Sequence, residues 1–428
     1  MAIDTVAEPS PRWKSMSADL DMIHDVMGGT RQMRQAGLRW LPKEHSETWE
    51  AWRARLNRSV LFNGLARTIA ALSGRPFGQD VTVMDAHPMI AEFIKNMDGK
   101  GCSLTTLAGQ MLRLMLRDGL VHVLVDTKPD GSSPYCVLVE ASQMIGLRRA
   151  PDTGQITQAR IRERILVQTG HFSDEWKDQI RVLEPEQWAI FRQDERKPSI
   201  WRQHQSGRMD ISHVPIVECA VNADASMITQ PPLMDLAWLN IAHWQSSSDQ
   251  RHILHIARVP ILFAKGMDAS DSQIEIGPNR IIIAEDNSAD IKFVEHSGAA
   301  IAAGHQDLLD LEEKMAVMGL DLIARRPGQP TATEKAIDHA QSNAFLHMLV
   351  DDLRDHLNAV LRLAALWFGL PEAAAGQVVL PKYFPINQQK SDQAHDLLDK
   401  HKTGMPADDF LTAVERNGIF NSMTTQRQ

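Results

Sequence analysis

Cysteine and long apolar stretches are both scarce in this chain. The three cysteines, Cys102, Cys136 and Cys219, are widely spaced and form neither a Cys-x-x-Cys nor a Cys/His pattern, which argues against a disulfide framework and a zinc site. No apolar run approaches the ~18 residues of a membrane helix. Residues 1–9 lack a basic segment followed by an apolar core, so we expect no signal peptide. These absences predict an intracellular protein that does not enter a membrane.

An excess of positive charge is also missing. The 428 residues carry 45 Lys and Arg against 54 Asp and Glu, a formal net charge of −9 at pH 7. Proteins that hold nucleic acid tightly present basic patches that displace counterions. This balance therefore argues against a tight DNA binder, but it is compatible with a protein that lets DNA pass. The length and the 43% hydrophobic content are those of a globular protein with two or three domains.

Motifs of catalytic and nucleotide-binding sites are absent from the sequence. There is no GxxxxGK[ST], GxSxG or HExxH, and no GxGxxG after a strand. His252 and His255 are three residues apart on a predicted helix, but no third ligand is near them in sequence, which favours a surface or bore-lining pair over a metal site. The segment from Asn96 resembles the start of a calcium loop, yet Cys102 and Leu104 stand where oxygen ligands are needed. We expect no enzyme, no cofactor and no bound metal.

What the sequence does contain is one very long helix after a kinked basic loop. Pro327 and Pro330 cannot continue a preceding helix. Thr331 offers an N-cap hydroxyl, and Glu334 three residues later completes a capping box. Apolar residues then recur at spacings of three and four as far as Trp367. A helix over residues 331–368 is about 57 Å long, which is typical of an assembly component more than of an enzyme pocket.

The segments before this helix alternate between helical and β patterns. A helix capped by Ser46 is expected to keep one apolar face as far as Ile69 and to end at residues 73–76. Helices are also expected at 231–256 and 299–323, each about 38 Å long, with a small β segment between them. Their matched lengths predict an antiparallel pair that carries the β segment at its tip. Further strand-like runs occupy residues 120–126, 135–140, 158–167, 179–183, 188–191 and 215–221.

Charged residues near the paired helices allow two interpretations. Residues 299–323 carry five Asp and Glu against Lys314 alone, which describes either an ordinary solvated face or a surface that repels phosphates. Arg325 and Arg326 precede the long helix, where they are either solvated or placed to touch a DNA backbone. After Trp244 the helix at 231–256 loses its apolar stripe, which suits a water-filled bore or a subunit contact.

The order of these elements, and several stretches within them, resemble the portal (head-to-tail connector) proteins of tailed bacteriophages. The resemblance is to one subgroup, long catalogued only as a domain of unknown function, and it spans the chain from about residue 46 to the tail. Because none of the stretches is a catalytic motif, the resemblance depends on their combination and order. The stretches are RLNRSVLFNGLARTI at 55–69, GRPF at 74–77, MDGKGCSL at 97–104, PLMDLAWLNIAH at 232–243 and ATEKAID at 332–338.

This resemblance implies a mainly helical α+β fold with the parts of a portal subunit. The short tail after residue 370 departs from the family pattern and makes a tall crown doubtful. The implied parts are an N-terminal arm at 1–16, a wing at 17–230, a stem helix at 231–256, a clip at 257–298, a second stem helix at 299–323, a tunnel loop at 324–333, the long wing helix and its connection at 334–386, and a reduced crown at 387–428.

The resemblance also implies a function. Portals form a ring, usually of twelve subunits, at one capsid vertex of the virion, and are assembled in the host cytoplasm. Double-stranded DNA enters and leaves through the central channel. The implied partners are further copies of the chain, the major capsid protein, terminase and a head-tail adaptor, with no membrane. The alternatives are another virion assembly component, such as an adaptor or scaffold, and an enzyme whose pocket joins several of His122, Asp126, His243, Asp249 and His252.

The portal resemblance places candidate functional residues in three groups. In each group the assignment follows from position in the implied part. The tunnel loop supplies Arg325, Arg326, Gln329 and Thr331; the channel-lining stem supplies Asp307, Asp310, Lys314, Asp321, Arg251 and His255; and the clip supplies Lys265, Arg280, Glu285 and Lys292 as docking residues.

Overall fold

The computed structural model divides the chain into two units. The helical unit comprises Asp21–Arg67 and Leu233–Ala324, and the sheet unit comprises Met1–Leu20, Thr68–Pro232 and Arg325–Gln428. Each unit is described by itself. The structure describes residues 5–128, 131, 133–221, 227–258, 261–265, 290–294, 298–320 and 332–381.

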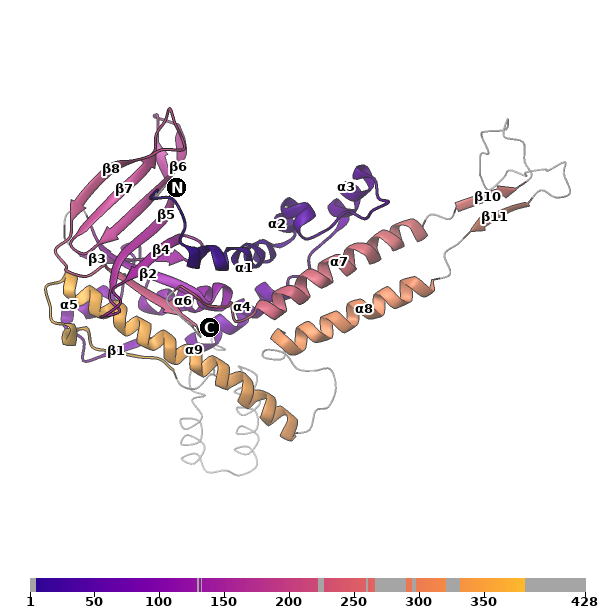
Figure 1. Cartoon of the computed structure of the whole chain (residues 1–428). Helices are drawn as coiled ribbons and strands as arrows, with labels where there is room; N and C mark the ends of the chain where they lie inside the picture. The colour runs from indigo at the N-terminus through magenta and orange to yellow at the C-terminus, as the bar shows by residue number, and fades with distance from the viewer. Residues whose placement is uncertain are drawn as a thin grey trace, which may run out of the picture. The chain divides into compact units, whose positions relative to one another are not determined.

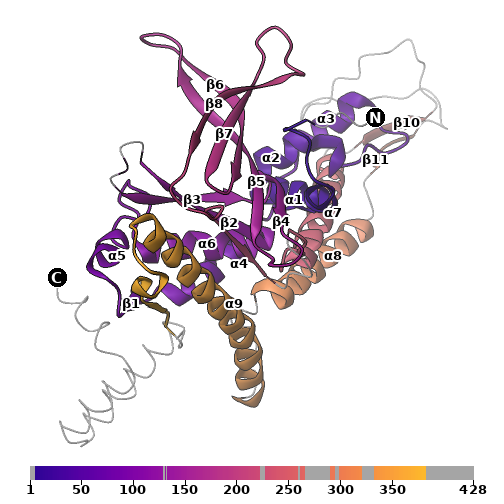
Figure 2. The same ribbon diagram turned by 60° about the vertical axis from the view of Figure 1, so that its left-hand side comes forward.

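The helical unit is built around two long helices that lie side by side (Figures 1 and 2). These are α7 (Met234–Ala257) and α8 (Ala299–Met315), and α8 continues into the π-helical turn η3 (Ala316–Leu320). Between them in sequence, β10 (Ile261–Lys265) and β11 (Asp290–Val294) pair antiparallel. The expected order of helix, β segment and helix is therefore present. Shorter helices complete the unit: α2 (Gly29–Ala36), η1 (Gly37–Arg39), α3 (Trp49–Arg58) and the last part of α1 (Pro11–Met27).

The single helix expected from Ser46 to residues 73–76 is wrong because the structure interrupts it, although its expected end agrees with the end of α4 (Gly64–Gly74). The structure has two helices there, α3 and α4. Thr48, not Ser46, caps α3, with its hydroxyl accepting a hydrogen bond from the Ala51 amide at 3.2 Å. The chain leaves the helix at Ser59, whose backbone is extended. Asn63 then caps α4 by accepting from the Ala66 amide at 3.0 Å.

The sheet unit contains two antiparallel sheets and a short strand pair. The three-stranded sheet has the order β3-β2-β9, and the five-stranded sheet has the order β4-β5-β6-β7-β8. A third pair joins β1 to β12. Their bounds are β1 Thr82–Met84, β2 Leu120–Thr127, β3 Pro134–Glu140, β4 Met144–Arg149, β5 Ile156–Gln168, β6 Asp174–Glu184, β7 Gln187–Gln193, β8 Trp201–Arg208, β9 Ile216–Ala220 and β12 Gln377–Val379.

Helices pack against the three-stranded sheet. Ser103 caps α6 (Leu104–Asp118) by accepting from the Thr106 amide, and Gly119 ends it in the left-handed conformation. The predicted long helix is confirmed as α9 (Ala332–Trp367), and from residue 346 onward its predicted apolar stripe is buried as far as Ala364. The Trp367 indole Nε1 donates to the carbonyl oxygen of Val125 in β2 at 2.7 Å. The remaining helices are α5 (Pro88–Phe93), η2 (Arg75–Phe77) and η4 (Glu372–Ala375).

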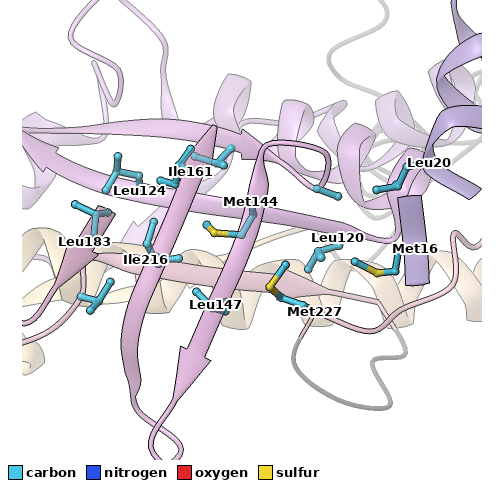
Figure 3. Close-up of a cluster of buried hydrophobic side chains, with 14 of the residues drawn as sticks. Met16, Leu20, Leu120, Leu124, Met144, Leu147, Ile161, Leu183, Ile216 and Met227 are labelled. Atoms are coloured by element: carbon cyan, nitrogen blue, oxygen red, sulfur yellow. The ribbon is translucent and has the colours of Figure 1, made fainter. Parts of the chain in front are cut away.

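The core of the sheet unit is an apolar cluster (Figure 3) to which the strands β2 to β6 and β9 all contribute. Leu120 and Leu124 enter it from β2, where the alternation of a strand directs every second side chain to one face. Met16 and Leu20 of α1 close one side. The helices and strands together make the predicted α+β class correct. In the part of the chain that the structure describes, no helix has both the length and the apolar character needed to span a bilayer.

One histidine is enclosed in this sheet. His122 of β2 is opposite Glu218 of β9 and is fully buried. Neither ring nitrogen has a hydrogen-bond partner among the described residues. Burial lowers the pKa of His122 to about 4, because a charged imidazolium loses its hydration there. His122 is therefore neutral in the folded state at pH 7.

Candidate functional site: the polar helix pair

Three polar links join α7 to α8 and fix their register. His243 Nε2 lies 3.2 Å from Glu312 Oε1. The Ser246 hydroxyl donates to Asp307 Oδ2 at 2.5 Å. Gln250 Nε2 donates to the carbonyl oxygen of Ile301 at 2.8 Å. Residues with higher numbers on α7 contact residues with lower numbers on α8, so the two helices run antiparallel.

An open groove with both polar and apolar lining residues lies between the two helices. Its volume is about 450 Å³. Gly304 of α8 makes space for Gln250, because a Cβ at that position would lie 2.3 Å from Gln250 Oε1. That oxygen has no hydrogen-bond partner in the described part of the chain. The groove is lined by Ala242, Gln245, Ser246, Asp249, Gln250, Ile253, Ala300, Gly304, Asp307 and Leu311.

The stem residues predicted to line a channel lie on polar, solvent-accessible faces of these helices. Asp307 lies at the groove and accepts from Ser246, as described above. Asp310 is exposed and accepts from Gln306 Nε2 at 2.7 Å. Lys314 is also exposed. The structure does not bring these side chains to one binding point but spaces them along α8.

On α7, the predicted channel residues Arg251 and His255 are both exposed and four residues apart. That spacing places them on one face of the helix. They are separate from His252, which is half-buried, so the pair of histidines noted in the sequence does not share one exposed face. Asp321, the remaining predicted stem residue, lies outside the described residues.

The charge of α8 is negative along its accessible length. Asp307, Asp310, Glu312 and Glu313 stand against Lys314, and of these Asp307, Asp310, Glu313 and Lys314 are exposed. Closely spaced carboxylates of one sign produce a negative surface potential that lowers the local concentration of anions. This face of α8 is therefore suited to repel phosphates.

A buried arginine holds α3 on α7. Arg55 is 4% exposed and binds both carboxylate oxygens of Glu47, Nε to Oε1 and Nη2 to Oε2, each at 2.9 Å. Its Nη1 donates to Asp249 Oδ1 of α7 at 3.2 Å. The hydrogen bond from Arg55 lowers the pKa of Glu47, whereas partial burial raises the pKa of Asp249.

Two further links extend this contact along α7. Arg58 Nη2 lies 3.2 Å from His252 Nδ1, and the Ser59 hydroxyl donates to the Ser248 hydroxyl at 2.9 Å. Arg55, Arg58 and Ser59 had no predicted role beyond their place in the portal-like stretch. No local pattern pairs them with α7, because the contacts join residues about 190 positions apart.

The groove between α7 and α8 does not bring together the residues named for the enzyme alternative. Of those five residues, only Asp249 lines this groove. His243 instead stacks near the Phe62 ring, with 5.3 Å between centroids. His122 is enclosed in the sheet core, and Asp126 accepts from Arg181 Nη1 at 3.0 Å.

Half of the predicted clip residues fall in described strands. Lys265 of β10 is opposite Asp290 of β11, and Lys292 of β11 is opposite Phe263 of β10. Arg280 and Glu285, and all four tunnel-loop residues (Arg325, Arg326, Gln329 and Thr331), lie outside the described residues.

Comparison with known families gives one match. A family model described as a domain of unknown function (DUF4055) matches residues 232–368. This range includes α7, α8 and α9, and it is about a third of the chain. No protein with a curated description matches the sequence.

Similar solved structures come from gene transfer agent (GTA) particles. A chain of the native GTA virion is 12% identical, with 82% of this chain and 89% of that chain covered and a TM-score of 0.42. A chain from the neck of the empty particle, computed with C6 symmetry, is 13% identical over 81% and 86%, with a TM-score of 0.42. One from the native neck, computed with C12 symmetry, is 13% identical over 78% and 85%, with a TM-score of 0.43. At TM-scores below 0.5 the likeness carries no weight for function.

Proposed function

We propose that this chain is a portal-type protein of a phage-like particle. Twelve copies form a ring at one capsid vertex, and double-stranded DNA passes through the ring during packaging and again at ejection. The chain has no catalytic step of its own and uses no cofactor. The observation that carries the proposal is the antiparallel α7 and α8 pair with its β10–β11 hairpin, followed in the sequence by the 36-residue helix α9.

The charge of the helix pair supports passage of DNA more than capture. Duplex DNA carries one negative charge per roughly 1.7 Å of its axis, and proteins bind it tightly by neutralising phosphates with Lys and Arg. A surface of exposed carboxylates on α8, repeated around a ring, repels those phosphates and prevents long-lived contacts. In this proposal Asp307, Asp310, Lys314 and Asp321 of the second stem helix and Arg251 and His255 of the first border the channel.

The other predicted parts receive their roles from position in the chain. The β10–β11 region, with Lys265, Arg280, Glu285 and Lys292, docks terminase during packaging and the head-tail adaptor afterwards. Arg325, Arg326, Gln329 and Thr331 touch DNA transiently from the tunnel loop. The wing, residues 17–230, faces the major capsid protein.

Reversing charge on α8 tests the proposal at the level of the particle. The double variant Asp310→Lys with Glu313→Lys converts two exposed carboxylates into phosphate-binding groups. We expect rings of normal mass but less nuclease-protected DNA per particle, with the deficit relieved by added salt. The matched control, Asp152→Lys with Glu372→Lys, makes the same change of charge at two exposed sites of the sheet unit.

The control variant is expected to package a normal amount of DNA. Equal packaging by both variants and the unmodified protein contradicts the proposed role of α8. Normal particles assembled without the chain, or with the chain only in the tail, assign it to another assembly component.

A further inference from the structure

The turn between β5 and β6 exposes an unusual amount of apolar surface. We call residues 166–176 the hairpin tip. Phe172 is 94% exposed, Trp176 58% and Leu166 53%. The turn itself is ordered, because the Thr169 and Gly170 amides both donate to the carbonyl oxygen of Ser173, at 2.9 and 3.2 Å. The aromatic side chains are therefore presented on a fixed turn.

An aromatic ring exposed to water at a loop tip forgoes the free energy that its burial provides. Burying a Phe side chain is worth roughly 1.5–3 kcal/mol, and aromatic residues are the ones that most often dominate protein interfaces. The neighbouring His171 ring contacts Phe172 with 4.3 Å between centroids, and the Arg164 guanidinium lies over Trp176 at 5.7 Å. These contacts leave the outer face of Phe172 in solvent. The hairpin tip is therefore a protruding apolar surface suited to docking.

The other end of the same five-stranded sheet has a hollow of about 660 Å³. We call it the sheet hollow. Phe191 of β7 contributes a half-buried aromatic ring to its wall, whereas the ring of Trp188 lies on the opposite face of β7 and packs against the core cluster. Its lining residues are Thr5, Val6, Arg148, Gln158, Arg160, Val182, Glu184, Gln187, Trp188, Ala189, Phe191, Gln203, Ser206, Gly207 and Arg208.

Two glycines let large side chains lie directly on the strands of this sheet, Gly207 on the core face and Gly146 on the face of the hollow. A Cβ on Gly207 would lie 2.9 Å from the ring of Trp188, its cross-strand partner, so the indole lies directly on the β8 backbone. A Cβ on Gly146 would lie 2.6 Å from Arg160 Nη2, so this guanidinium lies on β4 in the same way. Arg160 Nη1 also donates to the carbonyl oxygens of Val6 and Glu8, at 3.0 and 2.8 Å. Trp188 and Arg160 are thus held in place by the backbone around them.

The charges of the two features are opposite. Between residues 169 and 176 the tip carries Asp174 and Glu175 and no Lys or Arg, although Lys177 lies 3.8 Å from Glu175. The sheet hollow has three guanidinium groups, from Arg148, Arg160 and Arg208, and one carboxylate. That carboxylate, Glu184, accepts hydrogen bonds from Gln158 and Gln187 at 2.8 and 2.7 Å. An acidic hairpin tip with aromatic side chains and a basic sheet hollow with an aromatic wall are complementary.

The hairpin tip and the sheet hollow of one chain cannot contact each other. They are at opposite ends of β6, whose 11 residues span about 36 Å at the usual rise of a strand. Two different, mutually complementary surfaces on one molecule produce a head-to-tail contact between copies, which closes into a ring when the rotation permits. A second copy of this chain is therefore the occupant that matches both surfaces.

We propose that the hairpin tip of one copy docks in the sheet hollow of the next. Phe172 packs against Phe191, while Asp174 and Glu175 face Arg148 and Arg208. The contact between copies stands on the sheet unit alone, whereas its closure into a ring rests on the proposed function.

Disulfide trapping tests this contact directly. In a Cys102→Ser background, whose other two cysteines are buried, one tagged chain carries Phe172→Cys and a differently tagged chain carries Ser206→Cys. Mixing the two under mild oxidation is expected to give disulfide-linked heterodimers, and a chain with both changes a ladder of linked oligomers. Glu372→Cys, at an exposed site outside the five-stranded sheet, replaces Ser206→Cys in the control and is expected to give no linked heterodimer.

Charge exchange supplies a second, non-covalent test. Phe172→Ala is expected to weaken association about thirtyfold, as for a central aromatic anchor. Arg208→Glu, and separately Asp174→Lys with Glu175→Lys, are each expected to weaken it, and the combination of all three to recover most of the loss. Because these side chains are exposed, their replacement leaves folding intact.

The possible outcomes separate this inference from the proposed function. Intact rings without cross-links or charge exchange overturn the tip–hollow contact and leave the portal proposal standing. Cross-linked open chains that never close support the contact and contradict the ring. Cross-links from Phe172→Cys only to another virion protein assign the tip to that protein and overturn the inference.

Discussion

Arg55 and Glu47 form a paired, two-point salt bridge in the helical unit, with both N–O distances at 2.9 Å and with side chains only 4% and 9% exposed. The pair holds α3 against α7, because the same guanidinium also reaches Asp249. The salt bridge therefore anchors α3 to α7, one of the two helices of the polar pair.

Removing this arginine is expected to destabilise the helical unit. Arg55→Ala leaves the Glu47 carboxylate buried without its partner, and breaking a buried ion pair costs about 3–5 kcal/mol of unfolding free energy. Hydrogen exchange of the α3 amides measures the loss locally. Arg53→Ala, two residues away and exposed, is the control and is expected to change exchange little. Equal protection of α3 in Arg55→Ala and Arg53→Ala contradicts this account of the contact.

The buried His122 predicts a pH dependence of the sheet unit. Its folded pKa of about 4 lies below the usual value of 6.5, so the unfolded chain binds a proton first as the pH falls. Stability is complete above pH 6.5 and declines between pH 6.5 and 4, by about 3 kcal/mol at the lower end.

His122→Leu is expected to remove that decline. Hydrogen exchange of the β2 amides, followed from pH 7 to 4, is the measurement. His204→Leu changes an exposed histidine of β8 and is expected to keep the dependence of the unmodified protein. Identical pH profiles for His122→Leu and His204→Leu would falsify the assignment.

The buried side chain of Asn240 links α7 to the backbone at the start of α4, and this link yields a further prediction. Asn240 is fully buried on α7, accepts from the Leu65 amide at 3.0 Å and donates to the Phe62 carbonyl at 2.7 Å. Asn240→Leu leaves the Leu65 amide without its partner, whereas the Phe62 carbonyl still accepts from the Gly64 amide at 3.0 Å; the loss costs about 1–3 kcal/mol. Protection of the Leu65 amide is expected to fall well before that of β2. Unchanged exchange at Leu65 argues that water replaces the amide side chain without loss.

Arg325 and Arg326 yield a prediction from the sequence alone. If they touch the DNA backbone transiently from the tunnel loop, replacing both with Ala lowers the amount of DNA packaged or retained, without changing the mass of the ring. Quantifying encapsidated DNA and its release over time checks this. Normal packaging and retention by the double variant removes the proposed contact.

Most of the regular fold was predictable because its signals are local. The stripe from Leu346 to Ala364 repeats at helical spacing and becomes the buried face of α9. The strands with apolar runs, such as 120–126, are present for the same reason. The boundaries of α9 could be predicted from a capping residue and the following glycine.

Elements without a local apolar pattern were missed. The strand β8 (Trp201–Arg208) is polar and mostly exposed, since it is an edge strand, and nothing in its composition indicates a strand. The helix break after Arg58 was missed as well, because Ser59 and Asn63 act through contacts with Ser248 and Val26. Such contacts depend on tertiary structure.

In the candidate site too, features with a local sequence signal were predictable and those that depend on tertiary contacts were not. Acidic residues on α8 were identified from charge counting, and the structure places Asp307 and Asp310 on accessible faces. The pairing of Ser246 with Asp307 and the buried Arg55 were not predictable, since each joins residues far apart in the chain. The sheet hollow likewise requires Gly146 to meet the side chain of Arg160 on the neighbouring strand.

The mass and symmetry of the purified protein test the central claim most directly. Native mass spectrometry gives the number of subunits, and class averages of negatively stained particles show whether a central hole exists. The portal proposal predicts a closed ring of about twelve copies with an open centre, alone or after addition of its scaffold. A chain that remains a monomer or dimer under both conditions contradicts it.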